Sequence, residues 1–102
     1  MKLSKRIPLL FFTLLFMQIH LFAQISVTGK VVDKGVNEPL IGAQIVLDTG
    51  GGTVSDKNGN FTLNLKAGNY SGIVNYLGYE KKMITINTQN PDLGTIALQL
   101  SN

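Results

Sequence analysis

The stretch DKNGN at 56–60 has the residue types of a calcium loop, because carboxylate and amide oxygens at every second position suit that ion. The rest of the pattern fails. Phe61 stands where the loop needs glycine for its sharp turn, and Ala67 stands where it needs a bidentate glutamate. A tight turn explains the same stretch, since Asn-Gly suits positive φ between two alternating segments. We therefore predict no metal site and a structural turn formed by Asp56, Asn58 and Gly59.

The three glycines at 50–52 could let a backbone approach a phosphate. A phosphate-binding loop also needs Gly-Lys-Ser/Thr and the amino end of a helix, and neither follows here. We expect the whole stretch 49–65 to turn one β-strand into the next, as a hairpin between strands at Val54 and Phe61.

Catalytic side chains are scarce. The single histidine, His20, lies in a predicted export signal, and cysteine is absent. The remaining residues therefore cannot assemble a Ser-His-Asp or Cys-His site, or a zinc site with imidazole or thiolate ligands. A two-carboxylate glycosidase is formally open, but the acids fall mostly at strand ends and turns, where a solvated role is expected. We predict no enzyme and no cofactor.

Aromatic residues allow one binding alternative. Tyr70, Tyr76 and Tyr79, together with Phe61, could form a stacking platform for a glycan. Strand aromatics more often fill a core, so a small carbohydrate-binding module is an alternative and not the main reading.

The first residues predict export. A basic start is followed by an apolar run over 7–17 and by Ala23, where a peptidase could cut before Gln24. Leu21 is bulkier than the cleavage pattern prefers. A membrane anchor is the rival, but 7–22 is shorter than the roughly 20 apolar residues of a spanning helix. We expect a signal peptide at 1–23 and one domain at 24–102, in the periplasm or at the outer membrane.

Charge argues against nucleic acid as a partner. Three of the nine basic residues lie in the predicted signal, leaving six lysines against six acidic residues. The basic character of the whole chain thus belongs to the export signal, and no basic patch is expected on the domain.

Period-two alternation of apolar and polar residues recurs after residue 24, with turn residues such as Gly78 between the segments. No helical period is present in this part of the sequence. Seven short strands predict an all-β sandwich or barrel. We expect these strands at 25–32, 43–48, 53–55, 61–66, 70–79, 82–86 and 95–100.

Four segments in this order resemble the carboxypeptidase regulatory-like domain family: VTGKVVDKGVNEPLIGAQIVL (27–47), GTVSDKNGNFTLNL (52–65), VNYLGYEKKMITI (74–86) and LGTIAL (93–98). The resemblance implies a transthyretin-like, seven-stranded Greek-key β-sandwich. Such domains stand beside the catalytic domain of metallocarboxypeptidases without supplying its zinc ligands. They also stand at the N-terminus of SusC-type TonB-dependent outer-membrane receptors of Bacteroidetes.

Together with the predicted export signal and the missing catalytic residues, the resemblance leads us to expect an exported, non-enzymatic module with a scaffolding or protein-interaction role. Its partner would be an unidentified outer-membrane receptor or periplasmic component. An N-terminal fragment of a TonB-dependent receptor is the first alternative. The sequence ends at Asn102 without a plug or barrel, so we do not expect transport by this chain alone.

The last predicted strand, TIALQL at 95–100, carries no charge. An unblocked edge of this kind accepts a partner strand, unless the strand lies inside its sheet. We expect 95–100 to be either an inner strand or a docking strand, with Ile96, Leu98 and Leu100 as its apolar residues.

Overall fold

The computed structural model describes residues 24–102, so the predicted signal peptide at 1–23 lies outside the described residues. Within the described part, no helix is long and apolar enough to cross a membrane. The alternating segments form the seven strands β1 (Ile25–Asp33), β2 (Gln44–Leu47), β3 (Gly52–Val54), β4 (Asn60–Leu65), β5 (Asn69–Asn75), β6 (Lys82–Asn87) and β7 (Asp92–Leu98).

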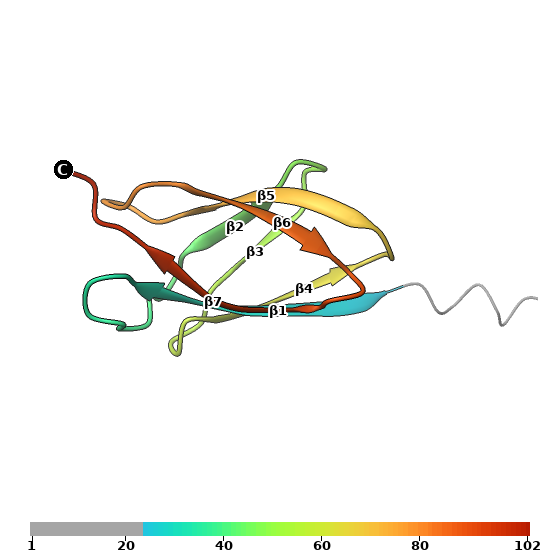
Figure 1. Cartoon of the computed structure of the whole chain (residues 1–102), viewed down its shortest axis with the longest axis horizontal. Helices are drawn as coiled ribbons and strands as arrows, with labels where there is room; N and C mark the ends of the chain where they lie inside the picture. The colour runs from blue at the N-terminus through green and yellow to red at the C-terminus, as the bar shows by residue number, and fades with distance from the viewer. Residues whose placement is uncertain (1–23) are drawn as a thin grey trace, which may run out of the picture.

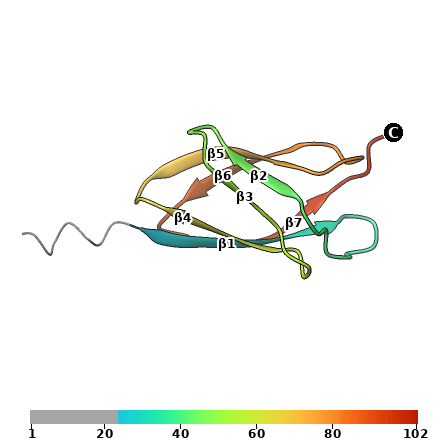
Figure 2. The same cartoon turned by 180° about the vertical axis from the view of Figure 1, so that it is seen from behind.

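The strands form two sheets, of order β4-β1-β7 and β3-β2-β5-β6. Figure 1 shows the two sheets as layers facing each other, and Figure 2 shows the same layers from behind. The predicted seven-stranded β-sandwich is confirmed. Because each sheet buries one face against the other, the alternation seen in the sequence becomes an inner and an outer set of side chains.

β1 is the central strand of the smaller sheet. It runs antiparallel to β4, with Gly29 opposite Phe61, and parallel to β7, with Val31 opposite Ile96. The strand after the predicted signal is therefore paired on both sides over much of its length. Its register with β7 shifts between Thr28 and Lys30, where β7 carries an extra residue. This bulge bends the edge of the sheet.

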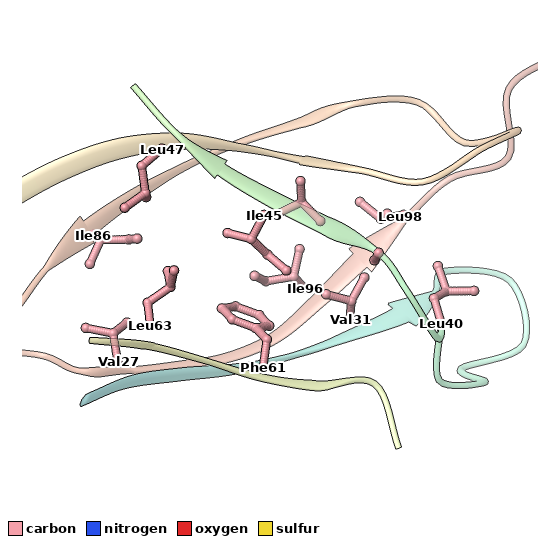
Figure 3. Packing of buried hydrophobic residues seen from close by; sticks show 12 residues of the cluster. Val27, Val31, Leu40, Ile45, Leu47, Phe61, Leu63, Ile86, Ile96 and Leu98 are labelled. Atoms are coloured by element: carbon pink, nitrogen blue, oxygen red, sulfur yellow. The ribbon is translucent and has the colours of Figure 1, made fainter. Parts of the chain in front are cut away.

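The core lies between the sheets, and its central cluster is made of buried apolar side chains. Every second residue of β1, β2 and β4 enters it, as the burial patterns of these strands show. Burial of these apolar side chains is the main driving force for folding, since the domain has no disulfide. Figure 3 shows Val27, Val31, Leu40, Ile45, Leu47, Phe61, Leu63, Ile86, Ile96 and Leu98 pointing into this space.

The predicted hairpin between Val54 and Phe61 is wrong. β3 pairs with β2 in one sheet, and β4 pairs with β1 in the other. The turn after β3 therefore carries the chain from one sheet to the other. The local pattern is the same for a hairpin and a crossing, because alternation does not say which strand is the partner.

The predicted bounds of two strands are also wrong. β5 ends at Asn75, and the next residues turn because Gly78 has a φ of 87° and the Tyr79 amide donates to the Tyr76 carbonyl at 3.0 Å. The last strand spans Asp92–Leu98 instead of 95–100. It begins early because parallel pairing with β1 extends beyond the residues that alternate.

Candidate interaction surface

The calcium-like stretch serves the turn between β3 and β4. Oδ1 of Asp56 accepts hydrogen bonds from the amides of Asn58 at 2.9 Å and Asn60 at 3.0 Å, and the Gly59 amide donates to the Asp56 carbonyl at 2.9 Å. Gly59 takes a φ of 80°, whereas Asn58 is not among the positive-φ residues, contrary to the expected Asn-Gly turn. In residues 24–102 there is no cluster of three His, Cys, Asp or Glu side chains that could hold a metal ion.

The glycine triplet at 50–52 lies in a hairpin, whereas the sequence predicted the hairpin at the next turn, between Val54 and Phe61. It joins β2 to β3, with the Leu47 amide donating to the Gly51 carbonyl at 2.7 Å. Gly50 has a φ of 103°, and its amide donates to the Leu47 carbonyl at 3.0 Å. These backbone groups bond within the hairpin, and residues 24–102 contain no helix whose amino end could face them.

The aromatic residues do not form one platform. Phe61 is buried in the core, and Tyr70 lies at the start of β5, where its hydroxyl donates to the Lys66 carbonyl. Tyr76 and Tyr79 follow the opposite end of β5, with ring centroids 5.4 Å apart in an edge-to-face arrangement. The strand between them spans about 20 Å, so a single sugar cannot stack on all three tyrosines.

A pair that sequence reasoning missed joins this turn to β1. The Tyr79 hydroxyl donates to Oδ2 of Asp33 at 2.5 Å, and Oδ1 of Asp33 accepts the amides of Gly35 and Val36. The bond from Tyr79, with help from the amides, lowers the pKa of Asp33 below its usual value. The same bond, with partial burial, raises the pKa of Tyr79 to about 12. The Asp-x-Gly turn was visible in the sequence, whereas nothing local pointed to Tyr79.

Two of the three candidate docking residues, Ile96 and Leu98, lie on the edge strand β7. β7 has β1 on one side only, so 95–100 is not an inner strand. Ile96 and Leu98 face the core, at 6% and 1% exposure. Leu100 lies beyond β7, is exposed, and forms an isolated bridge with Tyr79.

The free edge of β7 is partly occupied by the chain itself. The Gly94 amide donates to Oδ1 of Asp92 within the bulge, at 2.9 Å. Lys82 Nζ donates to the Ala97 carbonyl at 3.4 Å, and the Glu80 amide donates to the Gln99 carbonyl at 2.8 Å. A bulge and covering contacts are the devices that prevent strand addition at an edge.

The outer faces of the two sheets differ in polarity. The smaller sheet presents Ser26 and Thr28 on β1 and Thr62 and Asn64 on β4, all exposed. The larger sheet presents an apolar row, because Val46 lies opposite Ile73 and Ile73 lies opposite Met83. These three side chains are 50%, 40% and 83% exposed. Contiguous exposed apolar residues of this kind mark interaction sites more often than isolated ones do.

Comparison with known proteins places this fold in a family. The family model of the CarboxypepD_reg-like domain matches residues 27–102. The TonB-dependent receptor SusC of Bacteroides thetaiotaomicron is 39% identical over 77 residues, which cover 74% of this chain and 8% of the receptor. The chain thus spans a small fraction of the length of this relative.

Two solved structures are similar to this chain, and the first of them shares its fold. A DUF3823 family protein from Parabacteroides merdae has a TM-score of 0.51 at 14% identity, over 78% of this chain and 46% of that one. A 9R-lipoxygenase from Cyanothece has a TM-score of 0.49 at 17% identity, over 74% of this chain and 16% of that one. With the family model matched over almost the whole described part, this chain belongs to the CarboxypepD_reg-like domain family.

Proposed function

We propose that this chain is an exported, non-enzymatic protein-interaction domain that works with, or as a part of, a SusC-type TonB-dependent receptor at the outer membrane. The observation that carries the proposal is the 39% identity to SusC over 77 residues. That level of identity over nearly a whole domain supports a common structural role, although the matched region is 8% of the receptor.

A non-catalytic role is supported by the side chains available. His20, in the predicted signal, is the only histidine, and there is no cysteine. Buried side-chain polar atoms in residues 24–102 all have hydrogen-bond partners, and the Asp33–Tyr79 contact joins the end of β1 to the turn after β5. Catalytic groups are instead poised toward a substrate in a cleft.

Cell fractionation tests the location. Expressed with its own leader in the source organism, the protein should be found in the envelope fraction, and mass spectrometry should give an N-terminus at Gln24. A chain that begins at Met1 and stays in the cytoplasm would contradict export.

Cross-linking in intact cells tests the receptor association. A photo-reactive residue at Met83, which is 83% exposed, should give a cross-link to a TonB-dependent receptor if the two are separate chains. A matched photo-reactive residue at Thr62, on the polar outer face, is the control. If the domain is part of a receptor, an antibody raised against residues 24–102 should detect one large envelope protein. If the experiment gives no cross-link to a receptor and the antibody detects no large envelope protein, the proposal is wrong.

A further inference from the structure

The two sheets present four edge strands, and one of them combines an open backbone with apolar side chains. β3 has three residues, and the edge of β7 is interrupted by a bulge and partly bonded within the chain. β4 and β6 have six residues each. An edge of this length is a template for another strand unless it is blocked.

The direction of the β6 amides follows from its pairing with β5. The Thr88 amide donates to the Gly68 carbonyl at 3.1 Å, which continues the register of Tyr70 with Ile86 and of Gly72 with Ile84. In an antiparallel ladder the residues between such pairs point their amides and carbonyls away from the neighbour. Met83 and Thr85 therefore direct their backbone groups outward, and within residues 24–102 no recorded hydrogen bond engages them.

The side chains beside this edge favour an apolar partner residue. Met83 ends the row that runs from Val46 through Ile73, so a strand added to β6 would continue the row by placing its own side chain next to Met83. The corresponding residues of β4, Thr62 and Asn64, have polar side chains, and the side chain of Asn64 already accepts a hydrogen bond from Ser26. β6 is therefore the better edge for an apolar strand.

The lysines at the start of β6 favour an acidic residue at the adjacent end of a partner strand. Lys81 and Lys82 are adjacent and exposed where β6 begins, and β6 itself carries no acidic residue. An acidic side chain at this end of an added strand would be attracted to the Lys81 ammonium and to that of Lys82, which also donates to the Ala97 carbonyl. The attraction is weak and salt-dependent, and the exposed Glu80 beside the lysines reduces it.

We propose that β6 accepts an extended segment of a partner protein by strand addition, with an apolar residue beside Met83 and an acidic residue beside Lys81 and Lys82. Backbone hydrogen bonds to Met83 and Thr85 would supply affinity, and the flanking side chains would supply selectivity. This rests on the proposed function in taking the domain to bind protein. A second copy suits the edge less well, because β6 offers no acid to pair with the lysines of its twin.

Peptide selection tests the proposal without the natural partner. The probe is a phage-displayed library of random linear peptides, selected on the purified protein and counter-selected on Thr85→Pro. The outward amide of Thr85 makes no internal bond, so proline there blocks the edge without breaking the β5 ladder. Thr62→Pro on the outward side of β4 is the matched control, and thermal unfolding checks that both variants fold.

Selected peptides should alternate apolar and polar residues, carry Asp or Glu near one end, and bind about tenfold more weakly to Thr85→Pro than to Thr62→Pro. If Thr85→Pro does not fold, Met83→Glu replaces it, with Val54→Glu at the far end of the apolar face as its control, since Val54 is also exposed. Hydrogen exchange then locates the site. In the free protein the amides of Ile84 and Ile86 should exchange slowly and those of Met83 and Thr85 quickly, and peptide should protect the latter pair.

Three outcomes would overturn the proposal. The library yields no peptide that distinguishes Thr85→Pro from Thr62→Pro, or peptide protects β4 or β7 amides instead, or sedimentation shows that β6 is closed by a second copy. None of these depends on cell location, so a failure here is distinct from a failure of the proposed export and receptor association.

Discussion

The hydroxyl of Tyr79 and the carboxylate of Asp33 are joined by a 2.5 Å hydrogen bond across 46 residues of sequence. Asp33 ends the central strand β1, and Tyr79 ends the turn that follows β5 and bridges to Leu100. The bond therefore fastens the C-terminal segment and the turn at 76–79 to the smaller sheet.

Tyr79→Phe should lower the melting temperature by a few degrees, because it leaves Oδ2 of Asp33 without its donor in a partly buried position. Tyr70→Phe is the matched control, since the hydroxyl of Tyr70 bonds to the carbonyl of the exposed residue Lys66 and its loss should cost less. Thermal unfolding followed by circular dichroism measures both. Equal melting temperatures for the two variants would contradict a fastening role for the Asp33 contact.

Acid should weaken the domain through Asp33. The folded-state pKa of this carboxyl lies below its usual 3.8, so its contribution is fully present above that value and is lost as the pH falls through the folded pKa. Urea unfolding of the parent and of Asp33→Asn, from neutral pH to about pH 2, measures the effect. The stability difference between them should shrink on the acid side. A difference that stays constant would show that ionisation of Asp33 is not involved.

Gly59→Ala should destabilise the fold by roughly 2–4 kcal/mol. Gly59 has a φ of 80°, and an added Cβ would lie 2.5 Å from the Val31 carbonyl oxygen. Gly42→Ala is the matched control, since Gly42 has a φ of 81° and no atom within 4 Å of such a Cβ, so it should cost only about 1 kcal/mol of backbone strain. Chemical denaturation gives both free energies. A cost at Gly59 no larger than at Gly42 would mean that the close approach to β1 is relieved.

Gly29→Ala should destabilise by about 1–3 kcal/mol through overpacking. Gly29 lies opposite Phe61, and an added Cβ would lie 2.5 Å from Cζ of that ring. Phe61→Leu by itself also lowers stability. In the Phe61→Leu background, however, Gly29→Ala should cost less than in the parent protein, and a double-mutant cycle measures this difference. Strictly additive costs would contradict the contact as the cause.

The amides of β7 should exchange in alternation. The Lys34 amide donates to the Leu98 carbonyl, so the backbone groups of Leu98 and, two residues earlier, of Ile96 face β1. We expect slow exchange at Ile96 and Leu98 and fast exchange at Thr95 and Ala97. Uniformly slow exchange over all four residues in the isolated protein would show that the edge of β7 is covered by another strand.

Period-two alternation and turn residues are local properties, so the sequence alone was sufficient for seven short strands and an all-β sandwich or barrel. The family, and with it the sandwich, came from the resemblance of four ordered segments to the carboxypeptidase regulatory-like domain. It also indicated a turn at Asp56 and Gly59 in place of a calcium site, since residues missing from a ligand pattern can be counted without coordinates.

The tertiary structure alone decided which strands pair. It separated β3 from β4, placed β7 at an edge beside β1, and left β6 open with Met83 exposed. It also brought Tyr79 to Asp33. Pairing depends on contacts between residues far apart in the chain, and an alternating strand fits several neighbours equally well until the other strands occupy their places.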